Sequence, residues 1–254
     1  MTERVAIVRR PSSRMDEGIV THVERASADP ALAPRQHEAY VAAVAGAGWD
    51  IREVAPADDL PDSAFVEDTV VVCRDLAVLA RPGAPERQAE VAGTKELVRS
   101  LGLEIARIEA PGTLDGGDVL QVGSTVYVGR GGRTNAAGIR QLRSLLATRG
   151  RTVVPVPLRG VLHLKSAVTA LPDGTLVTAA TAAVEPGAFP AMRLVPEEAG
   201  AHVVPLGEGT LLMAASAPRS AELFDDLGFD VLTADISQFE KLEGCVTCLS
   251  VLVG

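Results

Sequence analysis

Pairs of short apolar runs recur along this chain, and this repetition constrains the fold more than any other feature of the sequence. Short runs of β-branched and aliphatic residues, separated by tight turns, are typical of neighbouring β-strands. The pairs occupy residues 69–73 with 76–80, 119–122 with 125–128, 166–171 with 175–178, and 201–205 with 210–213. Helical patterns follow three of these pairs, at residues 86–101, 136–149 and 220–227. The order strand, strand, helix predicts a chain built from repeated α/β units.

The first and the last apolar runs have no neighbouring run in the sequence. Val5–Val8 precedes the first pair, and Cys248–Val253 follows the last. If these two runs pair with each other they complete a fifth unit, and 254 residues then divide into units of about 51, a period typical of propeller and repeat architectures. The pattern slightly favours one closed domain over residues 1–254, and an ordinary mixed α+β sheet is the alternative.

Charge and composition disfavour several classes of partner. The chain has 24 Lys and Arg against 33 Asp and Glu, a formal charge of −9, whereas nucleic acids and anionic membranes bind basic surfaces. Aromatic residues make up 3%, too few for a base-stacking surface. No apolar run is long enough to span a bilayer, and the first ten residues lack the apolar core of a signal peptide. Three cysteines form no disulfide framework, so we expect a cytoplasmic protein without nucleic-acid or membrane partners.

The thiols offer one candidate nucleophile. Cys73 ends an apolar run and is expected in the core. Cys245 and Cys248 have C-x-x-C spacing, but a redox pair is disfavoured because such pairs open a helix, whereas this one leads into a strand. Structural zinc is disfavoured because only Cys73 and isolated histidines could complete a set of four ligands. A buried pair of small residues and a single nucleophilic thiol remain as alternatives.

Among the histidines, His163 has the most informative context. It is a basic residue within the apolar segment Val161–Lys165, so it is either a satisfied core residue or a catalytic group. A thiol and a histidine in the same chain are the pair that nucleophilic catalysis needs. His37 lies at the start of an amphipathic helix, and we expect it on a solvated surface.

Two acidic segments have both a structural and a functional interpretation. Asp115 and Asp118 flank a pair of glycines, and Asp62, Glu67 and Asp68 stand just before a buried strand. Turn and capping chemistry explains both segments. The functional interpretation is a cluster of carboxylates that binds a cation or orients a histidine. Acid pairs could also bind magnesium, but no phosphate-binding loop accompanies these acids.

Seven segments together carry a resemblance to a known family. They are residues 35–40 (RQHEAY), 60–68 (LPDSAFVED), 81–85 (RPGAP), 114–119 (LDGGDV), 132–135 (GRTN), 162–165 (LHLK) and 243–250 (EGCVTCLS). In this order and spacing they resemble dimethylarginine dimethylaminohydrolase, of the guanidine-modifying superfamily that includes arginine deiminase and the amidinotransferases. The resemblance covers nearly the whole chain. It implies a fivefold pseudosymmetric α/β propeller of about five ββαβ-type units around a central channel.

The resemblance also implies roles for ten residues. Cys248 would be the nucleophile, His163 the general acid and base, and Asp115 the carboxylate that orients the histidine. The implied substrate contacts are Asp62, Glu67, Asp68, Arg87, Arg133, Leu242 through its backbone, and Ile19 from a lid segment. The acids would hold the guanidinium or the ammonium of the substrate, and the arginines its α-carboxylate. Cys245 would be structural, and neither a metal nor an organic cofactor is needed.

The implied activity is hydrolysis of Nω-methylated L-arginine to L-citrulline and methylamine or dimethylamine, through a covalent thiouronium on Cys248. The alternative is hydrolysis of free arginine, or of another guanidine or ureido amino acid, by the same residues. Arginine deiminases usually carry an inserted helical domain, for which this chain has no room. A catalytically idle binding protein is disfavoured because Cys248, His163 and Asp115 are all present. The expected partner is a small cationic amino acid, and a homodimer is a further prediction.

Overall fold

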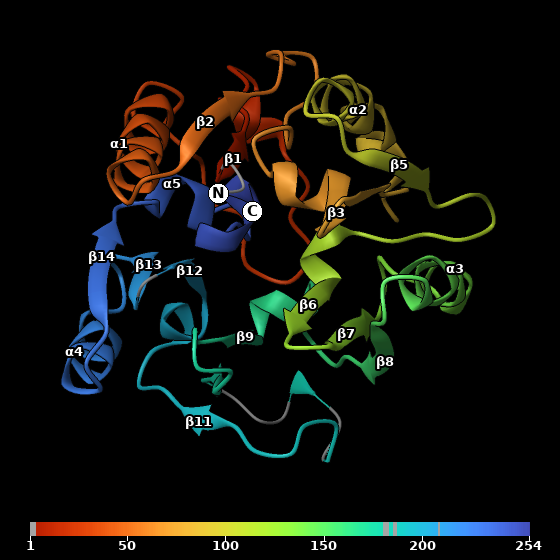
Figure 1. The fold of residues 1–254 in the computed structure, drawn as a ribbon. Helices are drawn as coiled ribbons and strands as arrows, with labels where there is room; N and C mark the ends of the chain where they lie inside the picture. Colours follow the sequence, from red (N-terminus) through yellow and green to blue (C-terminus); the bar gives the residue numbers. More distant parts are fainter. Residues whose placement is uncertain (1–3, 180–182, 185–186, 208) are drawn as a thin grey trace.

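Five three-stranded sheets stand around a common centre in the computed structural model, which describes residues 4–179, 183–184, 187–207 and 209–254 (Figure 1). In spatial order the first two sheets are β15 (Ser250–Val253), β1 (Val5–Val8) and β2 (Asp50–Glu53), and β3 (Val70–Cys73), β4 (Leu76–Leu79) and β5 (Glu104–Arg107). The third and fourth are β6 (Val119–Val122), β7 (Thr125–Arg130) and β8 (Thr152–Pro157), and β9 (Val168–Ala170), β10 (Leu176–Thr178) and β11 (Arg193–Leu194). The fifth is β12 (Val203–Gly207), β13 (Thr210–Ala214) and β14 (Asp230–Ala234).

One connection pattern repeats in every sheet. In the second sheet β3 pairs with β4 antiparallel, with Val70 opposite Leu79, and β5 then pairs with β4 in parallel, with Leu76 opposite Glu104. A tight turn joins the antiparallel pair, whereas a parallel pair needs a long crossover, which is usually a helix. The repeated ββαβ unit confirms the predicted α/β propeller class.

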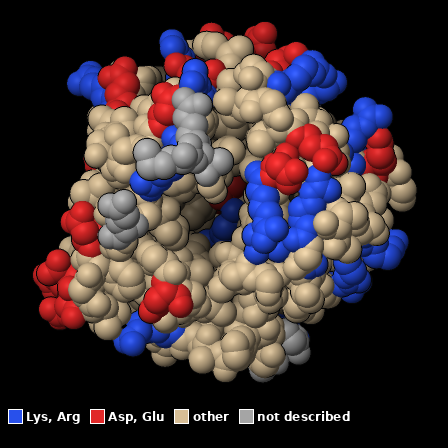
Figure 2. Space-filling model, viewed as in Figure 1, with Lys and Arg blue, Asp and Glu red and all other residues tan. Residues whose placement is uncertain are grey.

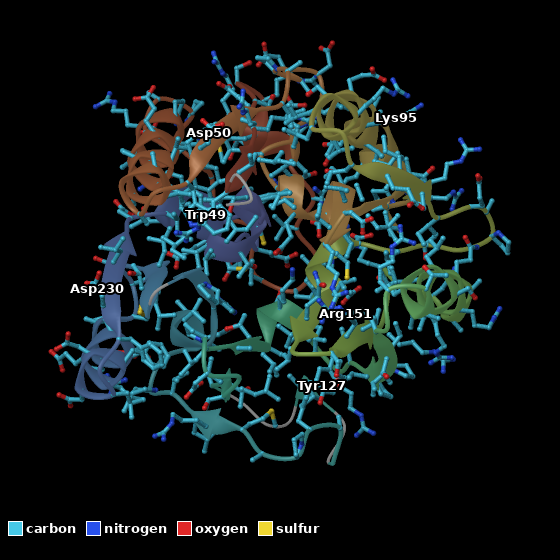
Figure 3. All side chains as sticks on the ribbon, in the orientation of Figure 1. Trp49, Asp50, Lys95, Tyr127, Arg151 and Asp230 are labelled. Carbon is cyan, nitrogen blue, oxygen red and sulfur yellow. The ribbon has the colours of Figure 1, made fainter. Side chains whose placement is uncertain are left out.

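The first and last strands of the chain belong to the same sheet. β1 pairs antiparallel with β15, with Val5 opposite Val253 and Val8 opposite Ser250. β1 and β15 therefore lie side by side, near the centre of the ring (Figure 1). Trp49 lies beside them, just before β2, and its indole donates to the carbonyl of Leu206 in β12 at 3.0 Å (Figure 3). This hydrogen bond ties the sheet that holds both ends to its neighbour.

The outer rim of the ring carries the helices α1 (Ala33–Gly46), α2 (Val91–Ser100), α3 (Ala136–Ala147) and α4 (Pro218–Asp226) (Figure 1). The short α5 (Ser237–Glu240) lies further in, beside α1. Val98 of α2, Leu142 of α3 and Phe224 of α4 are fully buried, in separate apolar clusters that each join neighbouring sheets. The hydrophobic core is thus divided among the seams between sheets, which leaves the inner ends of the strands free to carry polar groups.

Two sequence-based expectations need correction or completion here. His37 was expected on a solvated surface, but it is 5% exposed, because its ring packs near Phe239 of α5 at a centroid distance of 6.4 Å. The apolar pattern also missed the third strand of each sheet, because these outer strands are more exposed than the inner two and several begin with a polar residue, as Asp50 and Asp230 illustrate (Figure 3).

Within the described residues, no helix has the length and apolarity needed to cross a membrane.

Candidate active site

A short 3-10 turn precedes the inner strand of every sheet, and five of the ten predicted site residues lie in these turns or immediately before them. The turns are Val66–Thr69, Gly116–Asp118, Leu164–Ser166, Glu198–Ala201 and Val246–Leu249. Each turn occupies the same place in its unit, so the pseudosymmetry of the ring brings all five turns to one end of the inner strands. Asp68, Asp115, His163 and Cys248 therefore come together although they are far apart in the sequence.

His163 is held by carboxylates on both sides of its ring. Its Nε2 lies 3.1 Å from Oδ2 of Asp115, and its Nδ1 lies 3.8 Å from Oδ1 of Asp68. Burial by itself would lower the pKa of His163, but Asp68, the hydrogen bond to Asp115 and the nearby Asp118 outweigh it and raise the pKa to about 9. The imidazole therefore carries a proton at neutral pH.

Asp68 is fixed by an arginine and by a backbone N–H. Nη1 of Arg87 donates to its Oδ2 at 2.7 Å, and the N–H of Gly117 donates to its Oδ1 at 2.8 Å. Burial would raise the pKa of Asp68, but the charges of His163 and Arg87 and these hydrogen bonds hold it well below its usual range. Arg87 in turn forms a bidentate pair with Glu90, at 3.0 and 2.8 Å. Asp68 is thus a fixed negative charge beside the imidazole.

The two glycines between Asp115 and Asp118 permit a close approach rather than a hairpin turn. A Cβ on Gly116 would lie 1.9 Å from the carbonyl oxygen of Glu67, and a Cβ on Gly117 would lie 2.6 Å from Nδ1 of His163. No side chain fits at either position without moving its neighbours. The functional interpretation of this acidic segment, which orients a histidine, is therefore supported by the packing.

Cys248 lies at the end of the 3-10 turn before β15, in contact with Cys245. The two sulfurs are 3.3 Å apart, and each accepts the backbone N–H of the other residue. The hydrogen bond with Cys245, burial, and the charges of Cys245, Glu67 and Asp68 raise the pKa of Cys248 well above its usual value. In the free protein these effects favour the thiol form of Cys248.

A narrow cavity of about 300 Å³ joins these groups to the segment predicted as a lid. Its lining includes Ile19, Asp62, Asp68, Arg87, Arg133, His163, Leu242 and Cys248. The carboxylate of Asp62 accepts the N–H of Ile19, at 3.2 and 3.1 Å. The carboxylate of Glu243 accepts the N–H groups of Thr21 and Val23, each at 2.9 Å, and that of His22. Residues 19–23 are thus held over the cavity by two carboxylates.

No protein-family model matches the chain, but individual relatives do. The chain is 59% identical over 251 residues to N(G),N(G)-dimethylarginine dimethylaminohydrolase of Streptomyces coelicolor, which covers 99% of this chain and 97% of that protein. The chain belongs to the dimethylarginine dimethylaminohydrolase family. A relative of that name from Pseudomonas aeruginosa is 35% identical over 249 residues, 96% of this chain and 97% of that protein.

A solved structure from the dimethylarginine dimethylaminohydrolase family shares the fold. It is a cysteine-to-serine variant of the Pseudomonas aeruginosa enzyme complexed with citrulline, with a TM-score of 0.92 and 33% identity over 99% of this chain and 100% of that one. The recognition of the family from seven sequence segments is thereby confirmed.

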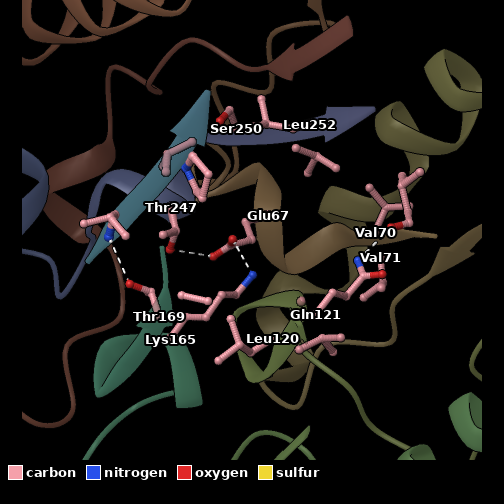
Figure 4. Close-up of a pocket in the computed structure, with 18 residues that line it drawn as sticks. Glu67, Val70, Val71, Leu120, Gln121, Lys165, Thr169, Thr247, Ser250 and Leu252 are labelled. Carbon is pink, nitrogen blue, oxygen red and sulfur yellow. Dashed lines mark hydrogen bonds and ion pairs between the residues drawn. The ribbon is translucent and has the colours of Figure 1, made fainter. Parts of the chain in front are cut away.

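Glu67 and Asp115 do not line the cavity that holds the other eight predicted residues. Asp115 lies behind His163 and is fully buried, as an orienting group should be. Glu67 instead faces the central channel, a hollow of about 940 Å³ that opens on the face shown in Figure 2. There it accepts a hydrogen bond from Lys165 at 2.5 Å and one from Thr247 at 3.0 Å (Figure 4). Burial raises the pKa of Glu67 to about 8 against the opposing charge of Lys165. Its predicted role as a direct contact of the substrate stays a prediction that this placement does not favour.

The two arginines differ in how freely they could bind a substrate carboxylate. Arg87 is 4% exposed and already bound to Asp68 and Glu90, so it fixes the acids around the cavity. Arg133 lines the cavity with a looser contact, 3.8 Å from Asp115. Of the two, Arg133 is the better placed to bind an α-carboxylate.

Sequence reasoning missed two acids and named no metal site. Glu90 and Glu243 escaped notice because their partners, Arg87 and the lid backbone, become visible only in three dimensions. Among the described residues, one group, Asp68, Asp115 and His163, brings three metal-binding atoms within 4.8 Å of one another. Its carboxylates also accept hydrogen bonds from Arg87, Gly117 and Gly83.

Proposed function

We propose that this protein hydrolyses Nω-methylated L-arginine, both asymmetric dimethylarginine and monomethylarginine, to L-citrulline and dimethylamine or methylamine. The observation that carries the proposal is one cavity in which a buried thiol, a carboxylate-bound histidine and a fixed acid meet, in a chain of the dimethylarginine dimethylaminohydrolase family. Cys248 is proposed as the nucleophile, His163 as the general acid and base, and Asp115 as the group that orients the imidazole.

The acids of the site support activation of Cys248 by the substrate itself. The hydrogen bond with Cys245, burial and nearby negative charge raise the pKa of the Cys248 thiol, and a guanidinium bound beside Asp68 would offset the charge of that acid. The cation thus favours the thiolate at the moment when its carbon lies within reach of the sulfur. A neutral ligand would have no such effect.

The charge on His163 suits the departure of the amine. With a pKa of about 9 the imidazole holds a proton at neutral pH, and it can give this proton to the methylated nitrogen as the C–N bond breaks. The thiol sulfur then holds the remaining carbon as a thiouronium. The neutral imidazole next takes a proton from water, and the hydroxide attacks that carbon. The C–S bond then breaks, and the hydroxyl proton passes to the departing sulfur, which releases citrulline and restores the Cys248 thiol.

Contacts at the rim support binding of the amino-acid end. Arg133 would hold the α-carboxylate, with Asp62 and the Leu242 backbone beside it, and Ile19 would cover the substrate from the lid. Arg87 would hold Asp68 in place, and Asp68 would position the guanidinium. These assignments are proposals from placement and charge.

The test is a citrulline assay of the purified protein with asymmetric dimethylarginine, monomethylarginine, arginine and agmatine. We expect turnover of the two methylated arginines and none in the Cys248→Ser variant. Faster turnover of arginine than of either methylated form would favour the alternative substrate class. Citrulline formation by the Cys248→Ser variant would refute the nucleophile.

Three broader predictions complete the proposal. We propose that residues 1–254 act as one catalytic domain, that the protein works in the cytoplasm, and that it forms a homodimer. Three free cysteines support a reducing compartment. Limited proteolysis, cell fractionation and sedimentation velocity test the three in turn.

A further inference from the structure

Cys245 is a buried nucleophilic group that the proposed reaction does not use, although it touches the proposed nucleophile. Its sulfur lies 3.3 Å from the sulfur of Cys248, and both residues are buried, at 5% and 7% exposure. The sequence disfavoured a redox pair because this motif leads into a strand, but the structure places a 3-10 turn between Cys245 and that strand. In a 3-10 turn, side chains three residues apart lie one above the other, so this turn places the two thiols face to face. A disulfide needs a separation of about 2.05 Å, so small side-chain rotations that bring the sulfurs closer by about 1.3 Å would join them.

The two cysteines line different cavities. Cys248 lines the narrow cavity that we assign to the substrate, whereas Cys245 lines a second cavity of about 870 Å³. His22, Ser166, His202 and Glu240 also line this second cavity. A small oxidant can therefore reach the thiol pair from a side that bound substrate does not occupy.

The surroundings keep the sulfur of Cys245 directed at Cys248. Oγ1 of Thr247 lies 3.2 Å from that sulfur and is itself hydrogen-bonded to Glu67, which pairs with Lys165 (Figure 4). The hydrogen bond from Cys248, with help from His202 and Thr247 and against burial, lowers the pKa of Cys245 well below its usual value. A thiolate beside a thiol is the combination that reacts with a peroxide and then closes a disulfide.

We propose that Cys245 and Cys248 form a reversible disulfide on exposure to hydrogen peroxide, with one cysteine resolving the oxidised form of the other. A thiolate attacks one peroxide oxygen, so the O–O bond breaks, the sulfur becomes a sulfenic acid by a two-electron oxidation, and hydroxide leaves. The second sulfur attacks the sulfenic sulfur. The S–S bond forms, the S–O bond breaks, and the hydroxide takes the remaining thiol proton to leave as water. A dithiol reductant reverses the oxidation.

The inference rests on the proposed function only for its effect on activity. If Cys248 is the nucleophile, the disulfide blocks attack on the substrate and also prevents irreversible oxidation of Cys248 to the sulfinic acid. The disulfide itself can be measured without any turnover, so failure of the proposed activity and failure of the disulfide are distinguishable.

Tryptic peptides separate the relevant cysteines cleanly. Lys241 is the last basic residue, so Cys245 and Cys248 share the peptide 242–254, whereas Cys73 lies in the peptide 53–74. After equimolar hydrogen peroxide, the 242–254 peptide should be lighter by two hydrogens, and dithiothreitol should restore its mass. The Cys73→Ser variant is the matched control and should behave like the wild type, because Cys73 packs in a different apolar cluster.

The Cys245→Ser variant tests the resolving role. Its 242–254 peptide should gain one or two oxygens instead of losing two hydrogens. For each protein, the activity after oxidation and reduction is expressed as a fraction of its own untreated activity. We expect dithiothreitol to restore more than about half of that activity in the wild type and less than about a tenth of it in the variant. Two results would overturn the proposal: oxygen addition without loss of two hydrogens in the wild-type peptide, or equal recovery by the Cys245→Ser variant. The peptide masses decide the question even if that variant is poorly folded, because the wild-type result stands alone.

Discussion

His163→Asn should flatten the alkaline side of the pH-stability profile. Asn keeps a polar side chain of similar reach but cannot take the proton that Asp68 and Asp115 stabilise on the imidazole. The pKa of His163 rises from 6.5 to about 9 in the folded protein. At about 1.4 kcal/mol for each pH unit, this difference corresponds to roughly 3 kcal/mol of stabilisation in the wild type.

The sign follows from which state holds the proton. Between pH 6.5 and about 9 the folded protein keeps His163 charged, whereas the unfolded chain has lost that proton. The contribution is therefore fully present below pH 6.5 and is lost as the pH rises through about 9. Glu67, whose pKa is raised to about 8, also makes the wild type less stable as the pH rises through this range. Subtracting the variant profile from that of the wild type removes this second contribution.

Urea unfolding followed by circular dichroism, at intervals from about pH 4 to about pH 10, measures the free energy of unfolding of both proteins. His37→Asn is the matched control, because burial lowers the pKa of His37 to about 4 and its effect falls on the acid side, between pH 4 and 6.5. That variant should flatten the acid side and leave the alkaline side unchanged. If the free energy of unfolding falls equally in the wild type and in His163→Asn as the pH rises from 6.5 to about 9, a charged His163 is refuted. A midpoint near 6.5 for the imidazole by NMR would refute it independently.

Three further substitutions test the packing around the site. Arg87→Met leaves two buried carboxylates without their cation and should lower the free energy of unfolding by about 3–5 kcal/mol, measured in urea. Gly117→Ala places a Cβ 2.6 Å from Nδ1 of His163 and should lower kcat at least about tenfold, whereas Gly46→Ala, which meets no atom within 4 Å, should leave kcat unchanged. Glu243→Gln weakens the acceptor for three lid N–H groups and should raise KM by about threefold or more with a smaller change in kcat; an unchanged KM would mean that these contacts do not order the lid.

The strands that the sequence pattern predicted are the more buried strands of each sheet. The pair β3 and β4 is nearly all apolar, so its runs are obvious in the sequence. β5, which completes the same sheet, reads EIAR and has two exposed residues among its four. A strand at the outer edge needs no apolar run, because one of its faces meets solvent. Only the repeated topology reveals that such a strand must exist.

The same distinction between local and long-range information applies to the site. Segments such as LDGGD can be identified because a close backbone approach demands glycine at fixed positions. The contact between Glu243 and the backbone of residues 21–23 joins parts of the chain about 220 residues apart, and any carboxylate in that turn would look like an ordinary surface residue. His37 was misjudged for the same reason, since its burial depends on Phe239 in a distant helix.

The balance of charge around Cys248 links the substrate to the activation of the nucleophile. In the free protein, the hydrogen bond with Cys245, burial, and the charges of Cys245, Glu67 and Asp68 raise the pKa of Cys248. A bound cation would therefore add to the charge of His163 in favouring the thiolate. A guanidinium supplies that cation, and a urea group does not. L-citrulline, which is neutral at this end, would therefore neither favour the thiolate nor bind the acids strongly. The same acids that raise the pKa of Cys248 would then select cationic substrates, promote release of the product and protect the thiol from attack on other electrophiles.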